Sequence, residues 1–261
     1  MGKILIGTAG WQIPAASRSA FPSSGTSLAR YAARLSAVEI NSTFRRSHRL
    51  VTYSRWAASV PDGFRFAAKL PETISHTLRL RGCREPLSAF LSEVSHLGDK
   101  LGCLLLQLPP SLCWDGRVAN GFLRTFRAQF DGAIVVEPRH PSWFTQHVNE
   151  TLARYRVSRA AADPAVVAMA ATPGGDGHFV YFRLHGSPRM YYSSYDDHYV
   201  VTLASQLRAL AQSGHCVWCI FDNTAAGCAL ANAVYLSDRL QGTDRKANAR
   251  SIRTRTRARD R

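Results

Sequence analysis

Short apolar runs alternate with longer amphipathic segments along almost the whole chain. The apolar runs are bounded by Gly, Pro, Asn or Asp, which is typical of short buried strands, whereas the longer segments show the periodicity of helices. Strands are predicted at residues 3–10, 37–43, 64–71, 103–110, 133–140, 158–164, 179–186 and 216–223. Helices are predicted at residues 27–35, 49–59, 86–97, 117–130, 144–155, 199–212 and 225–240.

This order of elements predicts a parallel α/β fold, because parallel strands need crossover connections and helices then cover the sheet. Eight such units in about 240 residues match the usual size of a (β/α)8 TIM barrel. A doubly wound open sheet is the alternative, but the chain has neither a G-x-G-x-x-G nor a P-loop motif. We therefore predict a single TIM-barrel domain over residues 1–241, followed by a tail at 242–261.

The strand predicted at 37–43 places polar and apolar side chains on opposite faces. Because side chains alternate along a strand, Val38 and Ile40 share one face, and Glu39, Asn41 and Thr43 share the other. In a TIM barrel, side chains near the carboxyl ends of the strands line the mouth, where active sites lie. The polar stripe is therefore expected to point into the barrel near its mouth.

Polar or charged residues also stand at the ends of the other predicted strands. They are Thr8, Lys69, Gln107, Glu137 with Arg139, Asp163, Tyr181 with Arg183 and His185, and Asp222 with Asn223. The pattern predicts a polar site at this edge of the strands. Asn223 or Thr224 is expected to cap the last helix. The free backbone N–H groups at this helix end can then bind an anion such as phosphate, or the capping can be ordinary and involve no ligand.

Two carboxylates and an imidazole in a basic cavity suit general acid–base catalysis. We predict that Glu137 acts as base or nucleophile, that Glu39 acts as acid, and that His185 transfers or orients a proton. An anionic group of the substrate is expected to be held by the basic side chains Lys69, Arg139 and Arg183.

The same charges have a structural alternative. Glu39 and Glu137 can pair with the basic side chains as an ionic network that fills the top of the barrel, although buried networks seldom add stability over apolar packing. Lys69 is either a Schiff-base amine or, as we favour, a counter-ion to the glutamates. His185 shares a strand face with Arg183, which favours a functional role for this histidine.

Side chains in the predicted loops extend the site. Trp11 and Trp143 either stack on a sugar or base or pack the loops over the rim. His140 lies in a loop after a strand and is expected to line the entrance. No metal is expected, because the chain has no H-E-x-x-H motif or cysteine cluster and the basic side chains disfavour a cation. No cofactor is expected.

The net charge of +15 is unevenly distributed. Residues 242–261 hold eight Lys or Arg and two Asp, a net +6, while the preceding 241 residues hold 25 Lys or Arg and 16 Asp or Glu, a net +9. The tail lacks apolar periodicity, so we predict that it is disordered, as a solvated appendage or as a segment that binds nucleic acid through counterion release. The basic body favours an anionic substrate or partner.

Composition and the lengths of apolar runs indicate a cytoplasmic protein without membrane contact. The chain is 46% hydrophobic and 20% charged, no apolar run reaches the roughly 18 residues of a membrane span, and no signal peptide precedes the first strand. The six cysteines include a C-x-x-C at Cys216 and Cys219, which face opposite ways on a strand. We therefore expect the cysteines to be buried, reduced thiols.

Several motifs, taken in order, resemble the YecE-like family, also called domain of unknown function 72. They are IGTAGW (6–11), VEINSTF (38–44), KLGCLLLQLPP (100–110), EPRHPSW (137–143), YFRLHG (181–186) and FDN (221–223), followed by NA (232–233). The resemblance covers roughly residues 4–240 and implies a TIM-barrel fold without implying an activity. The resemblance adds the motif residues Asn41, Gln107 and Asn223 to the predicted substrate contacts. His140 and Trp143 also belong to these motifs.

The sequence departs from the family pattern at two places. Ile13 stands where the pattern has a tyrosine after the first tryptophan, and Asp222 replaces the first of two asparagines. The first departure puts a contact by that loop in doubt, and the second adds a carboxylate that can change local pKa values.

Taken together, these features favour an enzyme that performs hydrolysis or a related acid–base reaction on a small phosphorylated or sugar-like substrate. A non-catalytic module that binds nucleic acid or other anions is the alternative, motivated by the basic body, the basic tail and the tryptophans. A purely structural scaffold is a third possibility, because barrels host many chemistries and the fold alone does not define one.

Overall fold

The structure is a computed structural model that describes residues 2–257, with side chains described from 2 to 242. The described residues form ten strands, most of them short and buried. The strands are β1 Ile4–Thr8, β2 Ala37–Ile40, β3 Arg65–Lys69, β4 Leu101–Gln107, β5 Ala133–Glu137, β6 Val157–Arg159, β7 Ala161–Asp163, β8 Gly174–Gly175, β9 Phe179–Leu184 and β10 Cys216–Phe221.

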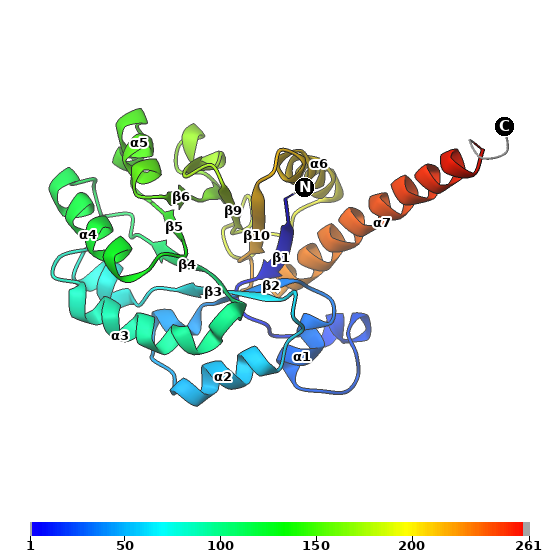
Figure 1. The fold of residues 1–261 in the computed structure, drawn as a ribbon, viewed down its shortest axis with the longest axis horizontal. Helices are drawn as coiled ribbons and strands as arrows, with labels where there is room; N and C mark the ends of the chain where they lie inside the picture. Colours follow the sequence, from blue (N-terminus) through cyan, green and yellow to red (C-terminus); the bar gives the residue numbers. More distant parts are fainter. Residues whose placement is uncertain (1, 258–261) are drawn as a thin grey trace.

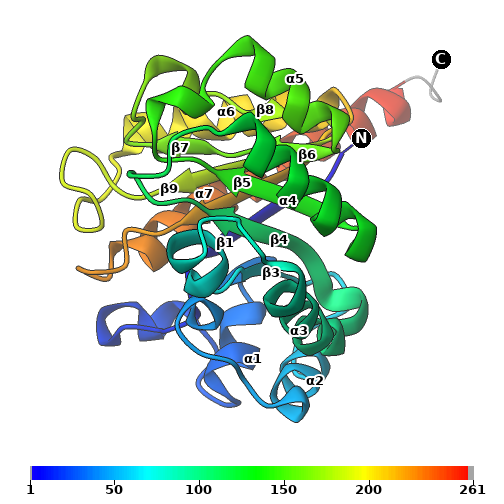
Figure 2. The same cartoon turned by 90° about the vertical axis from the view of Figure 1, so that its left-hand side faces the viewer.

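Helices connect the strands, as the apolar periodicity predicts. The α-helices are α1 Ser27–Ala32, α2 Leu50–Ala58, α3 Arg84–Val94, α4 Gly116–Gln129, α5 Gln146–Arg154, α6 Asp197–Gln212 and α7 Cys228–Arg257. Shorter helical turns lie at Ala15–Ala20, Ser42–Phe44, Thr73–Thr77, Ser95–Lys100, Pro141–Trp143 and Ala168–Ala171. Figure 1 shows α2, α3, α4 and α5 on the outside of the strands, and Figure 2 shows α3 and α4 side by side in front of β3 and β4.

The strands form two sheets rather than one continuous ladder. One sheet has the order β1-β10-β9-β7, and the other has the order β2-β3-β4-β5-β6-β8. All pairs are parallel except β6 with the two-residue β8. The prediction of a parallel α/β fold is therefore confirmed, whereas the continuous ladder of a closed eight-stranded barrel is not seen.

The two sheets meet where β1 lies beside β2 (Figure 1). Ala9 and Glu39 form an isolated parallel bridge, and the backbone N–H of Gly10 donates to the carbonyl of Glu39 at 2.9 Å. Gly7 allows this approach, because a Cβ at that position would overlap the backbone carbonyl of Ala37. The absence of a side chain at residue 7 thus positions Glu39 next to the end of β1.

Between the sheets lies a small core of buried side chains contributed by both of them. It consists of Leu5, Ala37, Ala67, Cys103, Leu105, Val135, Ala160, Tyr181, Trp218 and Ile220. Gly102 leaves the room that the Trp218 ring occupies, since a Cβ there would overlap this ring. A larger core fills the space between strands and helices. The inner core supports the charged side chains that follow it toward the carboxyl ends of the strands.

The observed strands are all shorter than the predicted ones, and two of the differences change the interpretation. The strand predicted at 37–43 ends at Ile40, because Asn41 adopts a helical conformation and a 3-10 turn begins at Ser42. The prediction that Glu39, Asn41 and Thr43 share one strand face is therefore wrong. The Thr43 hydroxyl instead donates to the carbonyls of Ile40 and Lys69, which ties the turn to β3. The strand predicted at 158–164 is divided at Ala160 into β6 and β7.

The last helix is longer than predicted. The backbone of α7 is helical to Arg257 and so covers most of the segment 242–261 that the sequence predicted to be disordered. The segment contains seven arginines and three alanines, which favour helix even without an apolar face. The side chains from 243 onward and residues 258–261 lie outside the described residues.

Candidate functional site

Arg183 on β9 lies at the centre of a buried group of charges. Its guanidinium binds Glu39 in a bidentate manner, with Nε 3.0 Å from Oε2 and Nη2 2.7 Å from Oε1. Its Nη1 donates to Glu137 at 2.8 Å, and Nη2 lies 2.9 Å from Asp222. The three carboxylates come from β2, β5 and the end of β10, so one guanidinium joins both sheets.

The guanidinium keeps its charge despite complete burial. Burial alone would lower the pKa of Arg183, but Asp222, Glu39 and Glu137 outweigh it and hold the pKa well above its usual value. The hydroxyl of Tyr181, two residues earlier on the same face of β9, donates to Glu39 at 3.0 Å. Both carboxylate oxygens of Glu39 therefore accept hydrogen bonds, which hold this side chain in place beside Arg183.

Glu137 is bound just as completely. One oxygen accepts from Arg183, and the other accepts from Arg139 Nε at 2.8 Å and lies 2.9 Å from His185 Nε2. Burial would raise the pKa of Glu137, but the charges of Arg183, Arg139 and His185 outweigh it and hold the pKa well below its usual range. Glu137 is therefore ionised at neutral pH.

His185 is placed between two carboxylates by the register of β9 and β10. Leu184 is paired with Phe221 in the sheet, so the next residues, His185 and Asp222, are neighbours. His185 Nδ1 lies 3.1 Å from Asp222 Oδ2, and Nε2 lies 2.9 Å from Glu137 Oε1 and 3.0 Å from Arg139 Nη2. Burial would raise the pKa of Asp222, but Arg183 and the hydrogen bond from His185 lower it.

Lys69 and Gln107 lie beside this group. Lys69 Nζ donates to Gln107 Oε1 at 2.8 Å, and Arg183 Nη1 lies 3.2 Å from the same oxygen. Among the described residues no carboxylate lies within ion-pair distance of Lys69, whose ammonium instead lies 4.2 Å from the centre of the Phe44 ring. Burial and the nearby Arg183 lower the pKa of Lys69 to about 8, although Glu39, Asp222 and Glu137 partly oppose this.

We call these residues the Arg183 cluster. It contains Glu39, Lys69, Gln107, Glu137, Arg139, Tyr181, Arg183, His185 and Asp222. The structure thus brings together seven of the twelve predicted site residues, namely Glu39, Lys69, Gln107, Glu137, Arg139, Arg183 and His185. Tyr181 and Asp222 were recognised as strand-end residues but were not assigned to the site. Their alternation and register with Arg183 and His185 were the signals that pointed to them.

The predicted asparagines lie outside the Arg183 cluster. Asn223 is fully buried and donates to the carbonyl of Ser193 and the side chain of Asn232, both at 2.9 Å. It therefore fastens the loop before α6 to the first turns of α7, which begins at Cys228 and not directly after Asn223. The Oδ1 atoms of Asn41 and Asn223 are buried and have no hydrogen-bond partner among the described residues.

The predicted aromatic contacts serve packing. Trp143 is buried, donates from Nε1 to the carbonyl of Leu112 at 2.9 Å, and packs edge-on against Trp114. Trp11 is partly exposed and packs edge-on against Trp56 at 5.0 Å. These contacts favour the alternative that the tryptophans hold the loops in place.

The loop between β9 and α6 covers His185. The Tyr191 ring lies edge-on to the imidazole with the ring centres 5.6 Å apart, and Met190 Sδ lies 3.7 Å from Arg139 Nη1. Tyr191 is itself partly exposed to solvent. His185 is therefore packed beneath this loop and is almost completely buried.

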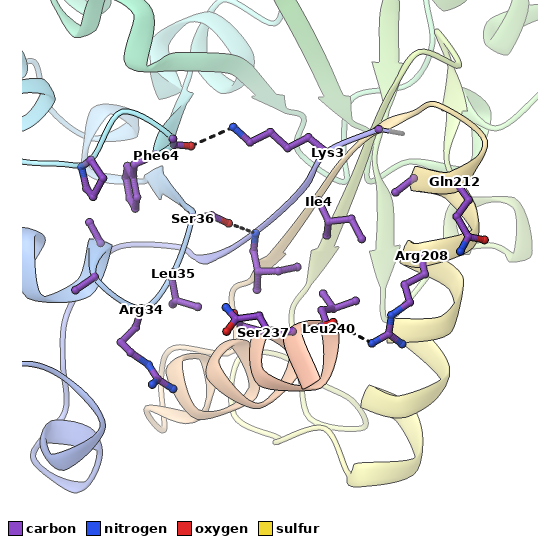
Figure 3. Close-up of a pocket in the computed structure, with 18 residues that line it drawn as sticks. Lys3, Ile4, Arg34, Leu35, Ser36, Phe64, Arg208, Gln212, Ser237 and Leu240 are labelled. Atoms are coloured by element: carbon purple, nitrogen blue, oxygen red, sulfur yellow. Dashed lines mark hydrogen bonds between the residues drawn. The ribbon is translucent and has the colours of Figure 1, made fainter. Parts of the chain in front are cut away.

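Other features of the described residues limit the choice of site. No group of three or more His, Cys, Asp or Glu side chains within the described part of the chain is arranged to hold a metal ion. Figure 3 shows a pocket of about 660 Å³ near the start of β1, lined by Lys3, Leu35, Arg208 and Leu240 among others. None of the predicted site residues lines that pocket. No helix of residues 2–257 is long and apolar enough to span a bilayer.

Two solved structures of the same family share this fold. A DUF72 family protein from Enterococcus faecalis V583 superposes with a TM-score of 0.78 at 21% identity, covering 92% of this chain and 96% of that one. A DUF72 family protein from Thermotoga maritima MSB8 superposes with a TM-score of 0.76 at 21% identity, covering 91% and 99%. At this identity the likeness establishes the fold alone.

Sequence comparison leads to the same family. UPF0759 protein YecE of Escherichia coli K12 is 33% identical over 151 residues, 53% of this chain and 52% of that protein. The chain thus matches about half the length of this curated relative. The sequence profile described as "Protein of unknown function DUF72" matches residues 5–257. The resemblance seen in the motifs is therefore confirmed, and the chain belongs to the DUF72 family.

Proposed function

We propose that this protein is an enzyme that carries out acid–base chemistry on a small anionic substrate, and that His185 transfers the proton. The observation that carries the proposal is the position of His185 Nε2. This nitrogen lies 2.9 Å from Glu137, which only accepts hydrogen bonds, and 3.0 Å from Arg139, which only donates them. A protonated Nε2 donates to Glu137, and an unprotonated Nε2 accepts from Arg139.

Asp222 supports the same role. Its carboxylate lies 3.1 Å from Nδ1 and, because it is ionised, keeps a proton on that nitrogen. The neutral ring then carries its free electron pair on Nε2, as a general base requires. Nε2 thus has an acceptor, Glu137, when it carries a hydrogen and a donor, Arg139, when it does not. His185 is thus better suited to proton transfer than Glu137, whose pKa Arg183 and Arg139 hold well below its usual range, and than Glu39, whose two carboxylate oxygens both accept hydrogen bonds from Arg183.

Lys69 and Arg139 supply the positive charge for an anionic substrate. The Arg183 cluster has three carboxylates and three cationic side chains, and protonation of His185 adds a further positive charge. Lys69 lacks a carboxylate partner among the described residues, so an anion near it meets a charge that is not already neutralised. A phosphorylated or carboxylated small molecule fits this balance better than a cation or a neutral sugar.

We propose further that the two sheets act as one barrel around this site. The bridge between Ala9 and Glu39 joins β1 to β2, and β6 and β7 follow each other in the chain with only Ala160 between them. The inner core draws its side chains from both sheets. These observations support a barrel whose carboxyl end holds the Arg183 cluster, which is where enzymes of this architecture place their active sites.

Ligand binding tests the proposal with the full chain. A thermal-shift screen with phosphate, sugar phosphates, small carboxylates, nucleotides and neutral sugars should yield a stabilising anion, because ligands that bind only the native state raise Tm. Lys69→Gln should weaken that shift, and His185→Gln should abolish turnover of the hit while preserving binding. His96→Gln is the matched control, because His96 is exposed and has no contact with the residues of the Arg183 cluster. Stabilisation by anions that is the same in Lys69→Gln, or turnover that survives His185→Gln, would contradict the proposal.

Binding of nucleic acid through the basic C-terminal segment is the second candidate. The segment carries a net charge of +6, and the backbone of α7 is helical through most of it. An oligonucleotide that stabilises or binds the protein should lose affinity in a variant with Arg253, Arg255 and Arg257 changed to Gln, and the loss should shrink at high salt. Binding of oligonucleotides alone, without any small anion, would favour this function over the enzyme.

A further inference from the structure

Cys113 and His140 form a thiol–imidazole pair outside the Arg183 cluster. Cys113 lies in the loop after β4 and His140 in the loop after β5, and Sγ is 3.2 Å from His140 Nε2. Cys113 is exposed to solvent, contrary to the expectation that the cysteines are buried. No other cysteine among the described side chains has such a hydrogen bond to a histidine.

The contacts of His140 define which nitrogen carries its proton. The backbone N–H of Ser142 donates to Nδ1 at 3.2 Å, and the Ser142 hydroxyl lies 2.8 Å from the same atom. That hydroxyl oxygen already accepts from the backbone N–H of Trp114 at 2.7 Å, so its own hydrogen is free to point at Nδ1. Because a backbone N–H can only donate, Nδ1 of the neutral ring is unprotonated and Nε2 carries the hydrogen.

The Nε2 hydrogen therefore points toward the sulfur of Cys113. A hydrogen-bond donor next to a sulfur stabilises the thiolate, which is the nucleophilic form of cysteine. His140 therefore acts as a hydrogen-bond donor to the sulfur and not as the base that takes the proton of a nucleophile, and a third group orients the imidazole. Ser142 is that third group here.

Packing between the two loops positions the pair. Trp114, next to Cys113, packs edge-on against Trp143, three residues after His140, with ring centres 4.7 Å apart. Trp143 in turn donates to the carbonyl of Leu112. These contacts join the loop of the thiol to the loop of the imidazole, so the 3.2 Å separation is built into the packing of the two tryptophans.

Cys113 also lines a pocket of about 230 Å³ that carries positive charge. Arg79 and Arg81 line the same pocket. Arg81 is paired with Asp115 at 3.1 Å, whereas Arg79 donates only to Ser111 and has no carboxylate within ion-pair distance among the described residues. An anionic group bound beside the thiol would meet the charge of Arg79.

We propose that Cys113 is a reactive thiol that exchanges with small disulfides bearing carboxylates. The Cys113 thiolate attacks one sulfur of the disulfide, a new S–S bond forms to that sulfur, and the second sulfur leaves as a thiolate that takes a proton from water. His140 orients and stabilises the attacking sulfur, and Arg79 binds a carboxylate of the disulfide. The proposal does not depend on the chemistry at the Arg183 cluster.

Intact-mass and peptide mass spectrometry of the full chain test this site. Oxidised glutathione is the anionic probe and cystamine the cationic one, both added to reduced protein. Cys113 should be modified faster than Cys216 and Cys228, the two partly exposed thiols, which serve as internal references. His140→Ala should slow the reaction about tenfold, the effect of losing one hydrogen bond to a charged group. Arg79→Gln should slow the reaction with oxidised glutathione more than the reaction with cystamine.

Two controls separate chemistry from folding. His147→Ala, at an exposed histidine on α5, should leave the rate unchanged, and thermal melts should show which variants keep the native fold. If His140→Ala unfolds, two measurements on the unsubstituted protein still test the proposal. They are which cysteine is modified and whether oxidised glutathione reacts faster than cystamine. Modification spread evenly over several cysteines, or a faster reaction with cystamine, would overturn the proposal.

Discussion

Arg183 binds Glu39 through two parallel hydrogen bonds, and neither side chain is exposed to solvent. A guanidinium in this position costs desolvation energy that only a complete set of partners offsets. Glu137 and Asp222 complete that set. Arg183 thus joins three buried carboxylates beside Lys69 and His185, so the stability of the protein and the chemistry proposed for His185 both depend on this one side chain.

Removing the guanidinium should destabilise the protein in a pH-dependent manner. Arg183→Met leaves Glu39, Glu137 and Asp222 buried without their shared cation, and breaking a buried pair costs about 3–5 kcal/mol. In the unsubstituted protein the pKa values of Glu137 and Asp222 are lowered. Their contribution to stability is therefore present above the pKa of the unfolded chain and is lost on acidification. In Arg183→Met these pKa values should rise above those of the unfolded chain. The free energy of unfolding of the variant should then decrease as the pH increases and the carboxylates ionise.

The deficit of Arg183→Met relative to the unsubstituted protein should therefore be larger at pH 7 than at pH 5. Urea unfolding followed by circular dichroism at the two pH values measures it. Arg34→Met is the control, because Arg34 pairs with Asp238 at the surface and such pairs contribute about 0–1 kcal/mol. A deficit that is independent of pH would show that the carboxylates are not the groups responsible.

Trp143 should behave as a core residue. Trp143→Ala removes a buried ring and a hydrogen bond to Leu112, and truncation of a buried tryptophan costs about 3–5 kcal/mol. Trp143→Phe keeps most of the packing and should cost far less. Thermal melts of both variants measure the difference. If Trp143→Ala keeps its Tm but loses a ligand found in the screen, Trp143 is a stacking surface and the packing interpretation is wrong.

The seam between the sheets should not tolerate a side chain at Gly7. A Cβ there overlaps the backbone carbonyl of Ala37, which cannot move without separating β1 from β2. Gly7→Ala should therefore destabilise the protein by about 1–3 kcal/mol or more. Gly121→Ala is the opposite case, since Gly121 is exposed within α4 and has open space around it, so it should stabilise by about 0.5–1 kcal/mol. Urea unfolding of the two variants should give shifts of opposite sign.

Alternation along strands was sufficient to predict that most residues of the Arg183 cluster lie together. Glu137 is two residues from Arg139 and Arg183 two residues from His185, so each pair stands on one face whichever way the strand turns. The carboxyl ends of parallel strands lie at one edge, which brings these pairs together without knowledge of the exact packing. The α/β class followed from the same periodicities, because apolar runs and amphipathic segments alternate.

The residue at which a strand ends and the contacts between loops could not be predicted from the sequence pattern. Asn41 continues the polar alternation of β2, yet the strand ends at Ile40 where a 3-10 turn takes over. His140 follows β5 like the site residues, but the turn after it directs its ring to Cys113. Trp143 is an apolar side chain that two loops bury together, and a contact between loops leaves no periodic signal.

Lys69 allows the cost of burying its ammonium group to be measured as a change in the free energy of unfolding. Its pKa in the folded protein, about 8, is lower than that of a free lysine because burial and Arg183 disfavour the charge. Between pH 8 and the higher pKa of the unfolded chain, the unfolded state binds more protons, so this group makes stability rise with pH. Below pH 8 both states are protonated, and the folded protein carries the full cost of the buried ammonium.

Lys69→Met removes that cost and should make the protein more stable than the unsubstituted chain at pH 7. The advantage should shrink between pH 8 and 10, because there the unsubstituted chain gains stability by releasing the Lys69 proton. Comparing the two proteins by urea unfolding at each pH cancels the titration of tyrosines, which both share. Lys3→Met, at an exposed lysine, should show no such trend. An advantage that persists undiminished at pH 10 would mean that Lys69 is not a buried cation, and the charge proposed to attract the anionic substrate would then lie elsewhere in the Arg183 cluster.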